Sequence, residues 1–193
     1  MIEKIPIEIS ARHCHLSERD MEKLFGDGYK LKKIKQLSQP YEFACEETVE
    51  IQFGSKKFEK VRVVGPTRGQ SQIEISLTDA VGSGNTPPLR LSGDLKDSLG
   101  CVVRGPKGEI KLSEGVIIAQ RHLHCSDEEA EELGLKNGDS VSIKAESLRP
   151  VIFEDVAVRV SDGYSLAFHL DTDEGNAAGI NKKGEGAIDL LLS

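Results

Sequence analysis

The phrase Arg-His-x-His occurs twice in this chain, at residues 12–15 and again at residues 121–124. A β-branched run precedes each copy, and a serine-led acidic segment follows it. The two copies contain four of the chain's five histidines, so a chance repeat is a poor explanation. The interval of 109 residues between His13 and His122 is too long for a solenoid repeat and suits a duplicated domain.

The spacing of the histidines has a geometric meaning. Side chains in an extended strand alternate between its two faces, so His-x-His directs both imidazoles the same way. Two converging imidazoles make half of a transition-metal site. The repeat therefore predicts two metal half-sites, one from His13 and His15 and one from His122 and His124, with zinc as the first candidate. The alternative is that these are surface histidines near the starts of helices. That alternative explains a single histidine well, but it explains a duplicated Arg-His-x-His phrase poorly.

Each half-site needs a third ligand. His169 alone reads as a structural histidine on a strand, but beside two ligand pairs it becomes a candidate third ligand. Glu74, which is flanked by isoleucines in an alternating segment, is the carboxylate candidate for the other metal, although the same pattern fits an ordinary exposed glutamate. Cys125 directly follows His124 and is a weaker candidate for an extra thiolate ligand.

Arg68 lies in a glycine-rich turn over residues 65–70. Backbone N–H groups and a guanidinium can share one phosphate in such a turn, although most turns of this kind only join strands.

Composition narrows the class of protein. A net charge of −7 argues against a nucleic-acid surface, but a few local arginines can still recognise a phosphate-bearing small molecule. No apolar run is long enough to span a membrane, and the N-terminus lacks the apolar core of a signal peptide, so a cytoplasmic protein is expected. The four cysteines form no Cys-x-x-Cys pair and are expected to be reduced thiols.

Short strand patterns separated by glycine-rich turns predict a mainly β fold. We expect two related β-barrel units, each with a short helix after its histidine pair. Ser17 would cap the first helix, and the second would span residues 127–133. Residues 29–40 are expected to form a loop or irregular strand, residues 78–88 are weakly patterned, and residues 82–88 are expected to form a mobile loop.

Several further phrases, taken with the two histidine pairs, resemble the PduL-type phosphotransacylases, also called phosphate propanoyltransferases. The likeness extends from about residue 6 to residue 178. Those phrases are Leu37-Ser38-Gln39-Pro40, Phe43-Ala44-Cys45-Glu46, Gln72-Ile73-Glu74-Ile75-Ser76, Ser92-Gly93-Asp94-Leu95 and Asp171-Thr172-Asp173-Glu174.

The resemblance implies an enzyme that reversibly transfers a short acyl group, propanoyl or acetyl, between coenzyme A and inorganic phosphate. It implies one barrel over residues 12–119 and a second over residues 120–193 that also takes up residues 1–11, with the strand before each histidine pair exchanged between barrels. Short helices cap both barrels, and a di-zinc site lies in the cleft between them. The expected partners are acyl-CoA and phosphate, with a homodimer as a further candidate. Some members carry an N-terminal extension that targets them to a bacterial microcompartment, and we expect no such extension here.

The resemblance also assigns roles to individual residues. One metal is held by the positions of His13, His15 and Glu74, and the other by those of His122, His124 and His169. Arg68 matches the phosphate-binding arginine. The coenzyme A pocket is lined by positions that match Glu8, Ile9, Ser10, Arg62, Arg121 and Asn176.

The residues alone are compatible with two mechanisms of acyl transfer and with two other classes of protein. Phosphate attacks the thioester directly in the favoured mechanism, with Arg68 orienting it; an acyl-enzyme on Glu74 is the alternative. A cupin-type oxygenase also uses His-x-His on a small barrel, but Glu18 lies too close to His15 for that motif. A metal-stabilised assembly module would use duplicated ligands but would leave Arg68 without a role.

Overall fold

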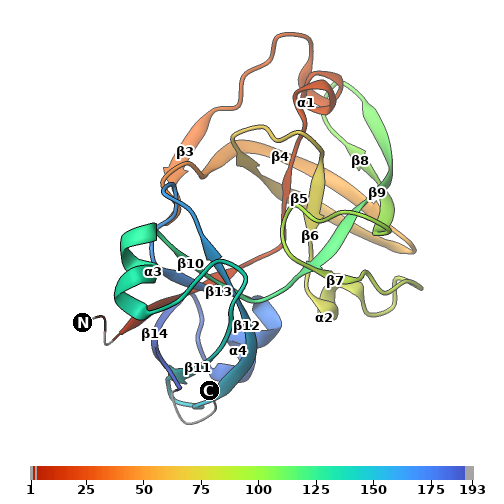
Figure 1. The fold of residues 1–193 in the computed structure, drawn as a ribbon. Helices are drawn as coiled ribbons and strands as arrows, with labels where there is room; N and C mark the ends of the chain where they lie inside the picture. The colour runs from red at the N-terminus through yellow and green to blue at the C-terminus, as the bar shows by residue number, and fades with distance from the viewer. Residues whose placement is uncertain (1, 3, 190–193) are drawn as a thin grey trace. The chain divides into compact units, whose positions relative to one another are not determined.

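The computed structural model describes residue 2 and residues 4–189 (Figure 1). The chain divides into two compact units. The first barrel comprises Arg12–Leu37 and Tyr41–Ala119, and the second barrel comprises Met1–Ala11, Ser38–Pro40 and Gln120–Ser193. No helix within the described residues is long and apolar enough to cross a membrane.

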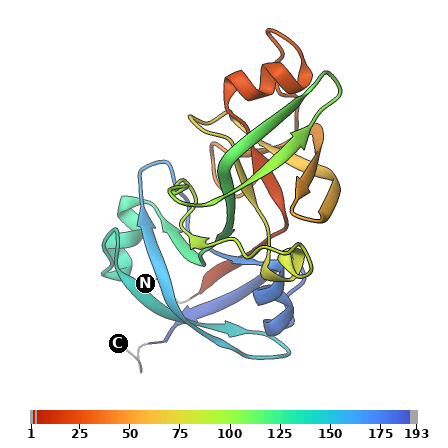
Figure 2. The same ribbon diagram turned by 90° about the vertical axis from the view of Figure 1, so that its right-hand side faces the viewer.

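Six strands of the first barrel pair in a closed ring, in the order β4, β5, β2, β6, β9, β8 and back to β4. Their bounds are β2 His13–His15, β4 Phe43–Phe53, β5 Lys56–Gly65, β6 Gln72–Glu74, β8 Leu99–Arg104 and β9 Glu109–Ala119. The short strands β3 (Lys33–Gln36) and β7 (Leu89–Arg90) add to its edges by pairing with β4 and β9. The antiparallel hairpin of β8 and β9 is the pair of green strands in Figure 2.

The second barrel is also closed, in the order β1, β13, β10, β12, β11 and β14. Its strands are β1 Ile5–Ser10, β10 His122–Cys125, β11 Ser140–Glu146, β12 Ile152–Val160, β13 Ala167–Asp171 and β14 Lys183–Ile188. The expectation of a mainly β fold with two related barrels and few short helices is thereby confirmed.

The two rings have the same pattern of pairing. Each histidine strand, β2 or β10, lies parallel to one neighbour (β5 or β12) and antiparallel to another (β6 or β13). That antiparallel neighbour then pairs in parallel with a strand from elsewhere in the chain, β9 or β1. The chain is therefore a structural duplication, as the repeated phrase predicts.

The strand before each histidine pair lies in the barrel that does not contain that pair. β1 precedes His13 but pairs with β13 and β14 of the second barrel. β9 precedes His122 but pairs with β6 and β8 of the first barrel. The predicted strand exchange is present.

Four short helices follow the strands that carry the predicted ligands: α1 (Glu18–Phe25), α2 (Leu77–Ala80), α3 (Asp127–Leu133) and α4 (Thr172–Ala178). A hydroxyl or carboxylate side chain caps each N-terminus by accepting from a backbone N–H: Ser17, Ser76, Ser126 and Asp171. The bounds of α3 agree with prediction. α2 and α4 lie in segments that show no helical periodicity, because each is only one to two turns long.

Two details differ from the expected strands, and a third agrees with them. The sequence pattern predicts separate strands over residues 109–112 and 116–119, whereas the structure has the single strand β9, in which Gly115 adopts a φ of 131° that glycine tolerates. Residues 33–36 form the edge strand β3, whose register shifts between Lys33 and Lys35, in agreement with the loop or irregular strand expected there. The polar, glycine-containing strand β14 was not expected at all.

Candidate active site

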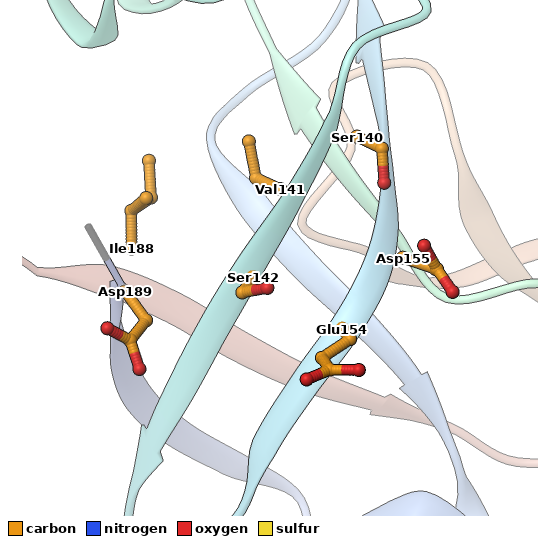
Figure 3. A pocket seen from close by; sticks show the side chains of 7 residues that line it. All are labelled: Ser140, Val141, Ser142, Glu154, Asp155, Ile188 and Asp189. Carbon is orange, nitrogen blue, oxygen red and sulfur yellow. The ribbon is translucent and has the colours of Figure 1, made fainter. Parts of the chain in front are cut away.

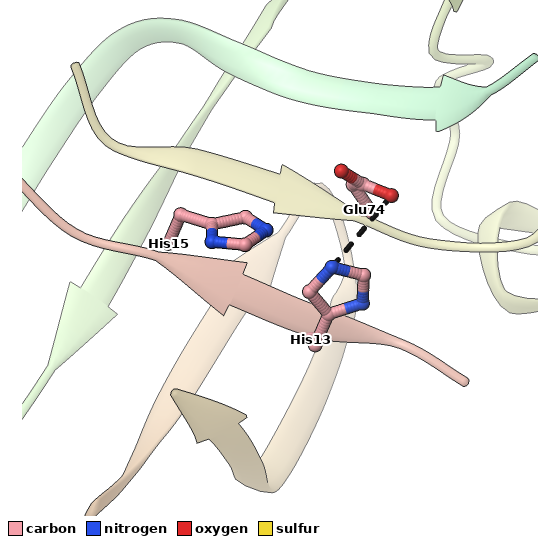
Figure 4. A group of neighbouring side chains, drawn as sticks. All are labelled: His13, His15 and Glu74. Atoms are coloured by element: carbon pink, nitrogen blue, oxygen red, sulfur yellow. Dashed lines mark ion pairs between the residues drawn. The ribbon is translucent and has the colours of Figure 1, made fainter. Parts of the chain in front are cut away.

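The first predicted ligand set converges on two adjacent strands of the first barrel. His13 and His15 lie on β2, and Glu74 lies directly opposite His13 on the antiparallel strand β6 (Figure 4). One nitrogen or oxygen atom from each of the three side chains lies within 4.8 Å of the others. His13 Nε2 lies 3.7 Å from Glu74 Oε2. Among the described residues, this is the group of three potential ligands that meets that spacing.

His15 is oriented by the neighbouring parallel strand. Its Nδ1 lies 3.1 Å from the carbonyl oxygen of Val64, so that nitrogen carries the proton and Nε2 has a lone pair for a metal. His15 as a whole is 2% exposed. Burial lowers the pKa of His15 well below its ordinary value, and the neighbouring His13 and Arg68 side chains lower it further. His15 is therefore a neutral imidazole, the form that binds metals.

Hydrogen bonds hold the Glu74 carboxylate. Its Oε1 accepts from Gln72 Nε2 at 2.5 Å and from Ser92 Oγ at 2.8 Å. Gln72 is held in turn by the backbone N–H of Gly93, at 2.8 Å. Burial by itself raises the pKa of Glu74, but the two histidines, the Ser92 hydroxyl and Arg68 outweigh it and lower the pKa below its ordinary value. Glu74 is thus a buried carboxylate kept ionised by its neighbours.

Arg68 is attached to this group through Ser92. Its backbone N–H donates to the carbonyl oxygen of Leu16 at 2.9 Å, which fixes the turn beside the end of β2. Its Nη1 donates to Ser92 Oγ at 3.0 Å, and its Nη2 donates to Glu42 Oε1 at 2.8 Å. The predicted oxyanion-binding arginine and the predicted ligand Glu74 therefore share one hydrogen-bond partner.

The second predicted ligand set converges in the second barrel. His122 and His124 lie on β10, and His169 lies directly opposite His122 on β13. The three ring centroids are separated by 4.5 Å, 5.1 Å and 5.0 Å. His122 Nδ1 lies 2.8 Å from the carbonyl oxygen of Gln120, which leaves Nε2 for a metal. Tyr164 stacks on His124 with ring centroids 4.0 Å apart.

Gln39 adds a polar group to this second set. The segment of residues 38–40 belongs to the second barrel although the residues on either side of it belong to the first. The Gln39 amide bonds both backbone groups of Ser165, at 3.0 Å and 3.2 Å, and its Nε2 lies 3.4 Å from His169 Nε2.

Both sets have the donor chemistry of a zinc site. Two imidazoles with a carboxylate, or three imidazoles, are ligand sets from which zinc forms a site with one position open to water or substrate. In each set, one histidine has its Nδ1 beside a backbone carbonyl oxygen. Histidines that bind a metal through one ring nitrogen usually make such a contact with the other. The donor types of both sets therefore suit zinc, and among the described residues His13, His15 and Glu74 also bring their ligand atoms within 4.8 Å of one another.

The candidates for a coenzyme A pocket lie on several elements. Glu8, Ile9 and Ser10 are consecutive on β1, and Asn176 is exposed on α4. Burial opposes ionisation of Glu8, but Ser38 and Lys183 outweigh it and lower the pKa of Glu8. Arg121 donates to the carbonyl oxygen of Glu154 and to Glu174 Oε1, at 2.6 Å and 2.9 Å.

Arg62 lies in the first barrel, on β5, and donates to the carbonyl oxygens of Cys45 and Glu46 at 2.8 Å and 2.9 Å. The weaker ligand candidate Cys125 is buried in the apolar core of the second barrel.

A separate hollow of about 350 Å³ lies on the second barrel (Figure 3). It contains none of the predicted site residues. Its lining consists of Ser140, Val141, Ser142, Glu154, Asp155, Ile188 and Asp189.

Sequence reasoning gave no role to Glu42, Gln72, Ser92, Gln39 or Tyr164. Gln39, Gln72 and Ser92 stand in phrases that carry the family resemblance, which was the available signal for them. Their contacts depend on strand register and loop return, which no local pattern shows.

Comparison with known proteins identifies the family of this chain. The family model described as phosphate propanoyltransferase matches residues 6–181. A phosphate propanoyltransferase of Priestia megaterium is 48% identical over 96% of this chain and 86% of its own length. A phosphate propanoyltransferase of Thermotoga maritima is 48% identical over 92% of this chain and 85% of its own length. One from Shewanella putrefaciens is 47% identical over 98% of this chain and 89% of its own length. The resemblance is confirmed: this chain belongs to the phosphate propanoyltransferase family of acyltransferases.

Proposed function

We propose that this enzyme reversibly transfers a short acyl group, propanoyl or acetyl, between coenzyme A and inorganic phosphate, with two zinc ions per chain. The observation that carries the proposal is the connection from Arg68 through Ser92 to Glu74, beside His13 and His15. It joins a group that binds oxyanions to a group that binds metals. Transfer of an acyl group from a thioester to phosphate can use both, because the arginine binds phosphate and a metal polarises the thioester carbonyl.

One zinc would be held by His13, His15 and Glu74, and the other by His122, His124 and His169. Bound zinc supplies Lewis acidity for oxyanions and for the thioester carbonyl. The chain's own residues then set position and charge.

In this proposal Arg68 binds phosphate and directs one of its oxygens toward the acyl carbon. A guanidinium suits the task because its planar set of N–H donors matches phosphate oxygens. Ser92 holds the guanidinium in place relative to Glu74. Positioning matters here because holding two reactants at attack distance removes much of the entropic barrier to their reaction.

The reaction forms a C–O bond between phosphate and the acyl carbon and breaks the C–S bond. The electron pair of that bond leaves with the sulfur of coenzyme A, and the proton released by phosphate balances the thiolate. In the reverse direction the thiolate attacks the acyl phosphate.

Direct attack is favoured over an acyl-enzyme on Glu74. The Glu74 carboxylate accepts two hydrogen bonds at Oε1 and has Oε2 near His13, so its lone pairs are engaged. A carboxylate in that state is a weak nucleophile.

The experiment is to mix the zinc-loaded enzyme with radiolabelled propanoyl-CoA and follow both thiol release and labelled protein. We expect thiol release only when phosphate is present, with no label retained on the protein after acid quench. Labelled enzyme formed from propanoyl-CoA alone would overturn direct attack, and phosphate-independent thiol release would overturn the proposed reaction.

A further inference from the structure

A carboxylate occupies one side of the proposed phosphate-binding arginine. Glu42 Oε1 accepts from Arg68 Nη2 at 2.8 Å, and the two side chains are 32% and 29% exposed. Both residues belong to the first barrel. Neither the metal ligands nor the proposed acyl transfer requires an acidic group at this place.

The backbone of Glu42 is fixed, so its carboxylate is held near Arg68. The carbonyl oxygen of Glu42 accepts from the backbone N–H of Leu37 at 3.1 Å and from Gln36 Nε2 at 2.8 Å. These bonds close the turn between β3 and β4. Glu42 is the residue immediately before β4 begins at Phe43.

The guanidinium of Arg68 therefore lies between two acceptors, Glu42 on Nη2 and Ser92 on Nη1. A guanidinium has five N–H donors, so it can hold both side chains and an oxyanion at once. Any oxyanion that binds Arg68 in this way comes close to the Glu42 carboxylate.

An ionised carboxylate accepts hydrogen bonds and donates none. An oxyanion beside it must therefore supply a proton, or the two negative groups repel each other across the shared arginine. Inorganic phosphate near neutral pH keeps at least one P–OH group. Sulfate has the same tetrahedral shape but keeps no proton.

We propose that Glu42 is a specificity-determining residue that selects a protonated tetrahedral oxyanion, hydrogen phosphate, over a fully ionised one such as sulfate. The P–OH group donates to Glu42 while the other oxygens accept from Arg68. This inference rests on the proposed function, because it takes Arg68 to be the phosphate-binding residue.

A purely structural role for Glu42 would give a different result. If Glu42 only oriented Arg68, its loss would weaken phosphate and sulfate to the same extent. If Glu42 selects the protonated anion, its loss weakens phosphate and strengthens sulfate. The ratio of the two affinities separates these roles.

The test compares wild-type enzyme with Glu42→Gln in the phosphate-dependent release of thiol from propanoyl-CoA. Sulfate is added as a competitive inhibitor, and the ratio of its inhibition constant to the KM for phosphate is measured. Loss of a hydrogen bond to a charged group changes a binding affinity by roughly tenfold or more. We therefore expect the ratio of the sulfate inhibition constant to the phosphate KM to fall about tenfold in Glu42→Gln. An unchanged ratio would overturn the proposal.

Two variants sharpen the comparison. Glu59→Gln removes a carboxylate from an exposed position on β5, where it pairs with Lys57 at 3.3 Å, and is expected to keep the wild-type ratio. Glu42→Asp keeps the charge and is expected to retain most of the preference for phosphate. If Glu42→Asp loses the preference as fully as Glu42→Gln, the charge is not the cause and the proposal fails.

The wild-type enzyme offers a test that needs no variant. Arsenate keeps a proton near neutral pH as phosphate does, so it should replace phosphate in thiol release, whereas sulfate should compete at least about tenfold more weakly than arsenate. Equal competition by the two anions would contradict the role of Glu42. Absence of any phosphate-dependent thiol release would instead overturn the proposed function, and the two failures are therefore distinguishable.

Discussion

Arg121 donates a hydrogen bond to Glu174, the residue whose carboxylate also bonds the backbone N–H of the N-cap of α4. Arg12 makes the same contact in the first barrel, with Asp79 at the matching position of α2. The Arg121 guanidinium also lies 5.9 Å from the ring centroid of Phe153, and the Arg12 guanidinium lies 5.0 Å from that of Phe58. Each arginine of the repeated phrase thus ties its histidine strand to the helix that follows the third ligand.

We therefore expect Arg12→Ala to destabilise the first barrel. The ion pair with Asp79 is partly exposed and the contact with Phe58 is a cation–π contact, so the free energy of unfolding should fall by about 1 kcal/mol. Urea unfolding measures the change. Lys4→Ala, which removes the well-exposed pair with Glu185, serves as the control and should leave the midpoint unchanged. Equal midpoints for wild type and Arg12→Ala would contradict the structural role.

Removal of a single histidine should empty a single metal site. We expect His13→Ala and His122→Ala each to lower the metal content of the purified protein from two ions per chain to one, because the two ligand sets lie in different barrels. Mass spectrometry of the metal content measures this. If His122→Ala retains both ions, the second histidine set is not a metal site.

Ser92→Ala should weaken phosphate use without unfolding the protein. The hydroxyl bonds both Arg68 and Glu74, and a hydrogen bond to a charged group contributes about 1.5–3 kcal/mol. We therefore expect kcat/KM for phosphate to fall roughly 10- to 100-fold, with circular dichroism as the check on folding. Wild-type kinetics in Ser92→Ala would show that the link between Arg68 and Glu74 has no role in the reaction.

The four cysteines should be unreactive in the native protein. All are buried, and burial raises the pKa of Cys45 and Cys125 to about 11 and that of Cys101 to about 12. A thiol reagent at pH 8 should label all four only after denaturation. Rapid labelling of the native protein would show that one of these thiols is accessible.

The same shifts predict a loss of stability at alkaline pH. A group whose pKa is raised on folding stabilises the fold below its unfolded pKa, which is about 8.5 for a thiol. That contribution is lost as the pH rises from this value through about 11. Cys45→Ala should therefore reduce the fall in stability between pH 8 and pH 11, measured by urea unfolding, and an unchanged fall would contradict the assignment.

The fold was predictable from sequence because its signals are local and repeated. Ser126 and the acidic residues after it mark the start of α3, and the alternating runs mark most of the strands. The duplication also shows in the spacing of the two histidine pairs. The strand exchange came from the family resemblance, since no local pattern shows which barrel β1 or β9 joins.

The predictability of the site was uneven. His13 and His15 share a strand, so their convergence follows from spacing alone. Glu74 and His169 are third-ligand candidates whose placement depends on register, and each lies opposite the first histidine of its pair. Glu42 and Ser92 reach Arg68 from loops 26 and 24 residues away in the sequence, and nothing in the pattern of either segment indicates that contact.

The central claim is that phosphate receives the acyl group of a coenzyme A thioester at this site. Phosphorus NMR of zinc-loaded enzyme incubated with propanoyl-CoA and phosphate tests it directly, with free thiol measured in the same sample. We predict that propanoyl phosphate forms in a one-to-one ratio with free coenzyme A, and that Arg68→Ala forms neither at a measurable rate. Release of thiol without propanoyl phosphate would contradict the account.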